Sequence, residues 1–149
     1  MLYRKAVRAL ARREHAVAEL RQRLSDAAPA KEVESVLSLL CRAGLLSDAR
    51  YAEVRSATAH RRGWGPVRLR RELEARGVAA ETIDEIVGDS ARRWVEEAAQ
   101  VRCRRFGTDI PKTPAETARQ IRFLQGRGFT MEQIRWVLRT AHDDGLEQG

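Results

Sequence analysis

The sequence is poor in the residues that crosslink a chain or interrupt its helices. It has two cysteines and four prolines among 149 residues, and the cysteines, Cys41 and Cys103, are 62 positions apart in apolar helical contexts. Two isolated cysteines predict neither a disulfide framework nor a clustered metal site, and unpaired thiols are typical of a reducing compartment. We therefore expect a cytoplasmic protein that folds without crosslinks.

Long apolar runs are also missing from the sequence. No stretch approaches the roughly 20 apolar residues that a membrane-spanning helix needs. The N-terminal segment lacks the apolar core of a secretory signal. We expect neither membrane insertion nor export.

The sequence offers little material for a catalytic or metal site. The three histidines, His15, His60 and His142, are scattered without a partner at metal-ligand spacing, and we interpret them as surface or helix-end residues. No strand is predicted for a phosphate-binding loop to follow, and the glycines lie at expected helix ends. The sequence thus predicts no catalytic residue, no metal and no cofactor, in a protein that is not an enzyme.

Charge is what the sequence does contain, and its sign alternates along the chain. The formal net charge is +7, and 25 of the 28 basic residues are arginine. A GC-rich genome would produce the same arginine excess, so the position of the charge is more informative than its type. Residues 1–24 carry +5, residues 25–53 carry −2, residues 54–76 carry +5 and residues 77–100 carry −4. The pattern indicates a repeating unit and a polyanionic or acidic partner.

Capping residues indicate where several helices begin. Thr113 and Glu116 frame a proline in the pattern of an N-cap hydroxyl, a first-turn proline and a glutamate at the third position. Thr130 and Gln133 repeat this pattern with glutamine. The segment Gly63-Trp64-Gly65-Pro66 predicts that one helix ends and the next begins at a tight corner.

Internal similarity divides the chain into three units. At a shift of 51 residues, Arg76-Gly77 coincides with Arg127-Gly128, and the neighbouring core positions agree as well. A weaker match at a shift of 49 relates Arg61-Arg62 to Arg12-Arg13. We interpret the two glycines as left-handed residues that end helices. The helices expected from the 3.6-residue periodicity are 2–13, 15–25, 31–43, 48–62, 66–76, 80–88, 91–106, 114–127 and 130–141.

The sequence therefore predicts an all-α fold of three tandem three-helix repeats. The repeats cover residues 1–46, 47–89 and 90–142, followed by a frayed tail at 143–149. A unit this small buries little apolar surface alone. We expect neighbouring repeats to pack together into an elongated, curved body.

The strongest candidate for a binding surface is the basic stretch around the Trp64 corner. Arginines flank an aromatic residue there, as they do where proteins contact nucleic acids or acidic grooves. Two interpretations stay open for the arginine pairs: contact with a partner, or a favourable interaction with the helix dipole. Trp64 is either a core residue or a contact residue. The candidate partner-binding or DNA-binding residues are Arg12, Arg13, Arg61, Arg62, Trp64, Arg68, Arg70 and Arg71.

Four segments of the chain resemble the RecX family of regulatory proteins. They are Arg12–Leu24, Gly44–Ala52, Arg61–Pro66 and Arg122–Phe129. The pattern Gly-Leu-Leu-x-Asp-x-x-Tyr-Ala, followed by Arg-x-Gly-aromatic-Gly-Pro, is the most specific part. The chain differs from the family where it has Trp64 in place of a more frequent tyrosine, and where its second helix lacks an N-cap serine.

The resemblance implies three tandem three-helix repeats and a negative regulator of the RecA recombinase. Such a protein binds in the groove of the RecA filament on single-stranded DNA, inhibits ATP hydrolysis and strand exchange, and promotes filament disassembly. The contact with the single strand is either direct or made through RecA, and we expect a monomer. Two alternatives stay open: a sequence-independent DNA-binding protein that competes for single strands, and a structural adaptor.

Overall fold

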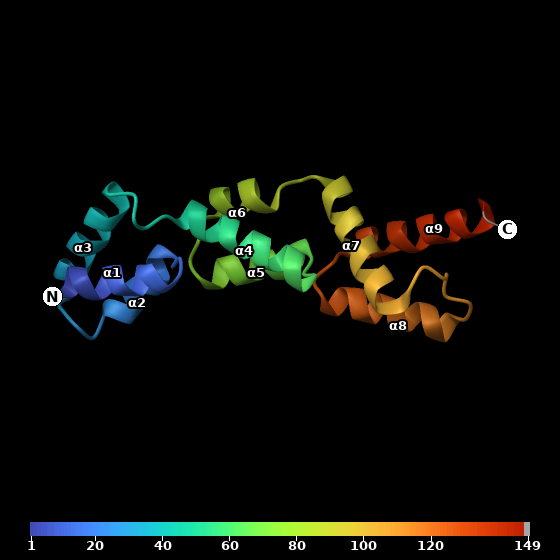
Figure 1. Ribbon diagram of the computed structural model, residues 1–149, viewed down its shortest axis with the longest axis horizontal. Coiled ribbons are helices and arrows are strands. Elements are labelled where there is room, and N and C mark those ends of the chain that lie inside the picture. The colour runs from blue at the N-terminus through green and yellow to red at the C-terminus, as the bar shows by residue number, and fades with distance from the viewer. Residues whose placement is uncertain (148–149) are drawn as a thin grey trace. The chain divides into compact units, whose positions relative to one another are not determined.

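The fold is described from a computed structural model, which covers the backbone of residues 1–147 and the side chains of residues 1–142. Within residues 1–147 the chain forms nine α-helices and no strand, so the all-α prediction is confirmed (Figure 1). The helices are α1 (Leu2–Arg12), α2 (Val17–Leu24), α3 (Ala30–Arg42), α4 (Asp48–Arg62), α5 (Pro66–Ala75), α6 (Ala80–Val87), α7 (Ala91–Phe106), α8 (Pro114–Gly126) and α9 (Met131–Glu147). None of the described helices is both long and apolar enough to cross a membrane.

The ends of eight helices lie within two residues of the expected ends, and only α9 differs more. It continues to Glu147, whereas the sequence predicted an end at residue 141. The residues after His142 are mostly polar and have no apolar stripe, so the periodicity gave no sign of the extension. The predicted frayed tail concerns 143–149, whose side chains lie outside the described residues, as do residues 148 and 149 altogether; it stays a prediction.

The capping chemistry explains why the later helices begin where they do. The amide of Glu116 donates to the Thr113 hydroxyl at 3.1 Å, and a Glu116 carboxylate oxygen accepts from the amide of Lys112 at 2.7 Å. In α9 the exchange is reciprocal, since Gln133 donates its amide to the Thr130 hydroxyl at 3.1 Å and accepts from the Thr130 amide at 2.9 Å. The box at Thr130 is confirmed. At Thr113 the hydroxyl cap and the helix start are confirmed, but Glu116 accepts from the amide one residue before the N-cap.

The chain divides into two compact units. The first unit consists of residues 1–57 and 71–88, and the second consists of residues 58–70 with the chain from residue 89 onward. In the first unit α1, α2 and α3 pack against one another around a buried core of Ala6, Ala9, Leu20, Leu24, Val33, Leu37, Leu40 and Leu46. In the second unit α7, α8 and α9 pack against one another, with Trp94, Ala98, Val101, Leu124, Ile134 and Val137 among the buried residues.

Two helix ends share one backbone arrangement, which confirms the sequence match at a shift of 51. Gly77 and Gly128 both have a positive φ, +76° and +94°. The amide of the residue after each glycine donates to a carbonyl five residues back, Val78 to Leu73 and Phe129 to Leu124, both at 3.1 Å. The left-handed glycine makes this pair of bonds possible, because a side chain there would be strained.

Candidate functional site

The turn between α4 and α5, residues 61–68, is held against the end of α8 by backbone contacts. We call these residues the second corner. The amide of Gly65 donates to the carbonyl of Arg127 at 2.7 Å, and the amide of Val67 donates to the carbonyl of Gly128 at 2.9 Å. A Cβ atom on Gly65 would lie 2.4 Å from the Gly128 carbonyl oxygen. The backbone approach at this corner therefore requires glycine.

Trp64 is a core residue that carries two arginines. Its side chain is buried, with 4% of its surface exposed. The guanidinium of Arg68 lies 4.2 Å from the ring centroid and that of Arg62 lies 5.6 Å from it, within the range of a cation–π interaction. The tryptophan thus orients two exposed cations, while its own contact with a partner stays a prediction.

The arginines of the second corner lack acidic partners. Arg61, Arg62 and Arg68 are exposed, and within the described residues none of them forms an ion pair. Arg61 donates to the hydroxyl of Thr58 at 3.3 Å. The second corner consequently presents positive charge that no described side chain neutralises with an ion pair.

The other candidate residues are divided between the units. Arg70 belongs to the second unit and is half-buried, while Arg71 is exposed and belongs to the first unit. Arg12 and Arg13 are exposed at the end of α1, also in the first unit. The structure therefore places five of the eight candidates in the second unit, namely Arg61, Arg62, Trp64, Arg68 and Arg70.

The equivalent turn between α1 and α2, residues 12–19, has different chemistry; we call it the first corner. His15 occupies the place of Trp64 and is buried, with 1% of its surface exposed. His15 lies at a helix end, directly before the N-cap of α2, but its burial shows that our interpretation of it as a surface residue is wrong. The sequence match at a shift of 49 aligned this histidine with a tryptophan, and that alignment was the signal for burial.

Glu19 pairs with Arg13 of the first corner and with Arg76. Its two carboxylate oxygens accept from the two Nη atoms of Arg13 at 3.0 and 2.9 Å, and Arg76 lies 3.3 Å away. Burial acts to raise the pKa of Glu19, but the hydrogen bonds and charge of Arg13 outweigh burial and hold the pKa below its ordinary value. Arg13 thus has a structural partner, unlike the arginines of the second corner.

Asp48 supplies the cap that α2 lacks in its own sequence. The N-cap residue Ala16 has no side chain that can accept a hydrogen bond. The Asp48 carboxylate, at the start of α4, accepts instead from the amide of Val17 at 2.8 Å. The departure from the expected serine cap is therefore compensated by a residue 31 positions further along the chain.

An arginine-lined hollow lies beside the second corner, with a volume of about 220 Å³. Five arginines line it: Arg61, Arg62, Arg104, Arg105 and Arg127. Sequence reasoning missed the last three. Arg104 and Arg105 end α7 as Arg61 and Arg62 end α4, so the recurrence of an arginine pair at the end of each repeat's first helix was the signal that could have found them.

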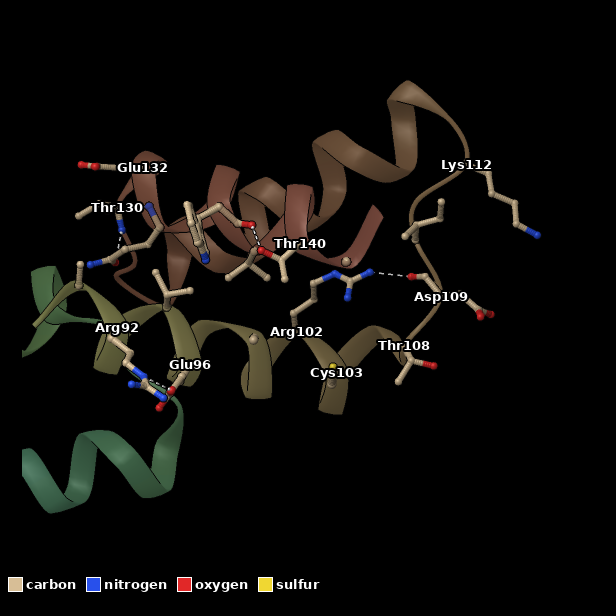
Figure 2. Close-up of a pocket in the computed structure, with 18 residues that line it drawn as sticks. Arg92, Glu96, Arg102, Cys103, Thr108, Asp109, Lys112, Thr130, Glu132 and Thr140 are labelled. Atoms are coloured by element: carbon tan, nitrogen blue, oxygen red, sulfur yellow. Dashed lines mark hydrogen bonds and ion pairs between the residues drawn. The ribbon is translucent and has the colours of Figure 1, made fainter. Parts of the chain in front are cut away.

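A larger cleft lies between α7, α9 and the segment that joins α7 to α8, with a volume of about 1110 Å³. Figure 2 shows Arg102 reaching from α7 toward this segment, where it donates to the backbone carbonyl of Asp109 at 2.6 Å. Trp136 lines the cleft and is 53% exposed. Arg92 and Glu96 at its edge pair with each other at 3.0 Å. The cleft is mainly apolar and presents no concentration of one charge.

In the described part of the chain, no group of three histidine, cysteine or acidic residues is placed to hold a metal ion. Both cysteines are free and exposed. What the described residues concentrate is positive charge, and that arrangement suits the binding of an anionic partner.

Comparison with known proteins identifies relatives over most of the chain. Models of the second and third three-helix domains of RecX match residues 47–86 and 93–138. The chain is 44% identical over 140 residues to the regulatory protein RecX of Halorhodospira halophila, covering 93% of this chain and 87% of the relative. It is 39% identical to the RecX of Ectopseudomonas mendocina, with 91% of each protein covered.

Solved structures show the same fold. The crystal structure of RecX from Lactobacillus salivarius superposes with a TM-score of 0.81, covering 95% of this chain and 94% of that one at 16% identity. A second crystal structure, of a regulatory protein RecX, gives a TM-score of 0.77 at 20% identity, with 91% of this chain and 70% of that chain covered.

Proposed function

Because the chain belongs to the RecX family of regulatory proteins, we propose that it is a negative regulator of RecA. It binds in the groove of the RecA filament on single-stranded DNA, inhibits ATP hydrolysis and strand exchange, and promotes filament disassembly. It does so in the cytoplasm, as a monomer, during DNA repair and recombination. Its repeats cover residues 1–46, 47–89 and 90–142.

The observation that carries this proposal is the uncompensated charge of the second corner. Arg62 and Arg68 stack on the buried ring of Trp64 at 5.6 and 4.2 Å, so their positions are fixed before a partner arrives. Less side-chain entropy is lost when pre-ordered residues bind. Two ordered cations without acidic partners are suited to an acidic protein surface or to DNA phosphates, both of which a nucleoprotein filament offers.

Regulation requires that the protein distinguish between two states of the filament. A ligand shifts an equilibrium only by the difference between its affinities for the two states. A protein that binds the active filament and a releasing filament unequally therefore acts at fewer copies than there are DNA binding sites. A protein that merely coats single strands inhibits only in proportion to the number of DNA binding sites that it occupies.

The test is single-strand-stimulated ATP hydrolysis by the cognate RecA, with this protein added in small substoichiometric steps. We expect a steep loss of turnover at far fewer copies of this protein than there are DNA binding sites. Loss that appears only in proportion to the DNA binding sites, and that excess free DNA reverses completely, would instead support the competing function, a sequence-independent DNA-binding protein. No loss at any ratio would overturn both.

The second corner is tested by the double substitution Arg62→Glu and Arg68→Glu. We expect the concentration needed for half-inhibition to rise at least about tenfold, because two charge reversals at one interface cost more than the roughly 1.4 kcal/mol of a tenfold change. The matched control is Arg4→Glu with Arg8→Glu, which changes the net charge equally at two exposed residues of α1. Equal potency of the two variants, both folded by circular dichroism, would exclude the second corner as the contact surface.

A further inference from the structure

The arginine-lined hollow is built from the ends of three helices of the second unit. Arg61 and Arg62 come from the end of α4, Arg104 and Arg105 from the end of α7, and Arg127 caps α8. Five arginines that come from distant parts of the sequence therefore line a hollow of about 220 Å³. No carboxylate is among the lining residues.

Helix-end chemistry accounts for only part of this cluster. Cations near a helix C-terminus are stabilised by the free carbonyl groups of the last turn. Arg127 does use such a group, because it donates to the carbonyl of Arg62 at 3.0 Å. Within the described residues, none of the five guanidinium groups pairs with a carboxylate. Like charges in so small a space repel one another unless an anion joins them.

Aromatic contacts hold two of these arginines in place. Phe106 and Phe123 meet edge to face, with ring centroids 5.3 Å apart. Arg105 lies over both rings, at 5.5 and 5.7 Å, and Arg127 lies 5.2 Å from the centroid of Phe123. The cations of the hollow are thus partly ordered without a ligand, which lowers the entropic cost of binding one.

The shape of the hollow favours phosphate over carboxylate. A carboxylate presents its two oxygens in one plane, which suits a single guanidinium fork. A phosphate presents oxygens in several directions, which suits guanidinium groups that approach from three helix ends. At about 30 Å³ for each displaced water, the volume corresponds to roughly seven waters, enough for one or two phosphate groups and too little for a partner helix.

We propose that this hollow binds phosphate groups of single-stranded nucleic acid, so that the chain touches the strand directly rather than only through its protein partner. The inference rests on the proposed function in one respect: the strand that the hollow binds is the single-stranded DNA inside the RecA filament. The site itself is tested without RecA. The phosphate chain of a free nucleotide offers the same chemistry, and a separate arm of the test distinguishes it.

The test measures the anisotropy of a labelled oligothymidine against the whole chain over a series of salt concentrations. Arg104→Glu with Arg105→Glu is expected to weaken binding at least about tenfold. The slope of log K against log salt should fall by about 1.4, because each single-strand phosphate contact contributes about 0.7. Arg8→Glu with Arg135→Glu, at two exposed residues outside the hollow, is the matched control and should change affinity less than about threefold.

A second variant guards against a folding defect. Arg105 stacks on two rings, so its reversal disturbs packing, whereas Arg104 is exposed and stacks on neither. Arg104→Glu alone should lower the salt slope by about 0.7 with an unchanged melting temperature. If the double variant and the control bind oligothymidine equally, the proposed site is overturned.

Two competitors test the ligand class. Inorganic tripolyphosphate should displace the strand from the unaltered protein, and a polyglutamate peptide of matched charge should not. Equal displacement by polyglutamate would overturn selectivity for phosphate. Tripolyphosphate binding that disappears in the double variant while strand binding persists would overturn the strand as the source. Arg62 belongs to both the hollow and the second corner, so the two proposals are separated by residues that belong to one of them alone. Loss of inhibition in Arg68→Glu tests the second corner, and loss of oligothymidine binding in Arg104→Glu with Arg105→Glu tests the hollow.

Discussion

The two corners occupy equivalent places in their repeats but differ in how their charge is balanced. In the first corner, Arg13 forms a bidentate ion pair with Glu19. In the second corner, the equivalent positions are Arg62 and Arg68, and both stack on Trp64. A single position, glutamate in one repeat and arginine in the other, decides whether the corner neutralises itself. A structural repeat can therefore keep its fold while only one copy offers charge to a partner.

The corners also differ in how closely the next helix end approaches. In the first unit, a Cβ on Gly77 would lie 2.7 Å from the side chain of Ala18. In the second unit, a Cβ on Gly65 would lie 2.4 Å from the backbone carbonyl oxygen of Gly128, so two backbone segments would have to separate. Ala16 occupies the place of Gly65 in the first corner, so that corner already accommodates a Cβ.

The largest effect that we expect from this difference follows Gly65→Ala. The new methyl group would force apart two backbone segments joined by the bonds from Gly65 to Arg127 and from Val67 to Gly128. Overpacking costs about 1–3 kcal/mol and a strained hydrogen bond about 1 kcal/mol more. We expect about 3 kcal/mol of destabilisation, seen as a melting temperature lower by about 10 °C in circular dichroism.

The control for this substitution is Gly126→Ala. Gly126 lies in α8, and the methyl group of an alanine there would meet nothing within 4 Å. Alanine also favours a helix by up to about 1 kcal/mol over glycine. The melting temperature should stay the same or rise. Equal melting temperatures for the two variants would show that the second corner does not need its close backbone approach.

Much of the fold was predictable because the signals were local. The capping pairs Thr113 with Glu116 and Thr130 with Gln133 fixed two helix starts from neighbouring residues. The glycines Gly77 and Gly128 fixed two helix ends in the same way. The end of α9 was not predictable by these means, because its last turns have neither a cap signal nor an apolar stripe.

The candidate site was predictable in part. The basic second corner is visible in sequence because its arginines and tryptophan are close along the chain. The contribution of Arg104, Arg105 and Arg127 depends on where α7 and α8 end in space, which no local pattern encodes. The same holds for Asp48, whose capping bond to Val17 joins residues 31 positions apart.

The buried residue of each corner predicts a different response to acid. Burial lowers the pKa of His15 in the folded chain, an effect that the Arg13 carbonyl opposes and the Arg13 charge reinforces. Below pH about 6.5, the ordinary pKa of histidine, His15 therefore binds a proton in the unfolded chain that it resists in the folded chain. The contribution of His15 to the unfolding free energy is complete above this pH. It is lost as the pH falls, by at most about 1.4 kcal/mol per pH unit. Trp64, in the same place of the second corner, does not titrate.

Urea unfolding between pH 7.5 and 5.5 measures this response. His15→Leu should remove most of the decrease in unfolding free energy, and it also removes the Nε2 atom that has no hydrogen-bond partner. The control is His142→Leu, at an exposed histidine, which should keep the decrease. If the two variants show the same pH dependence, His15 is not the source of the acid sensitivity.

The smallest expected effect concerns how each corner starts its second helix. In the first corner, Asp48 accepts from the Val17 amide at 2.8 Å, and a lost cap costs about 1 kcal/mol. In the second corner, Pro66 stands at the same first position and has no amide hydrogen to satisfy. Asp48→Ala should therefore lower the unfolding free energy by about 1 kcal/mol, whereas Asp26→Ala, at an exposed residue, should not change it.

Transferring the proline of the second corner to the first provides the decisive comparison. The backbone of Ala16, with ψ at 151°, already has the extended conformation that a following proline requires. In a Val17→Pro background no amide hydrogen is left for the carboxylate to accept, so Asp48→Ala should cost no more than a few tenths of a kcal/mol. A double-mutant cycle by urea unfolding measures the difference. An undiminished cost in the proline background would mean that Asp48 stabilises the first unit through contacts other than the Val17 amide, and the two corners would then differ in more than the chemistry of one helix start.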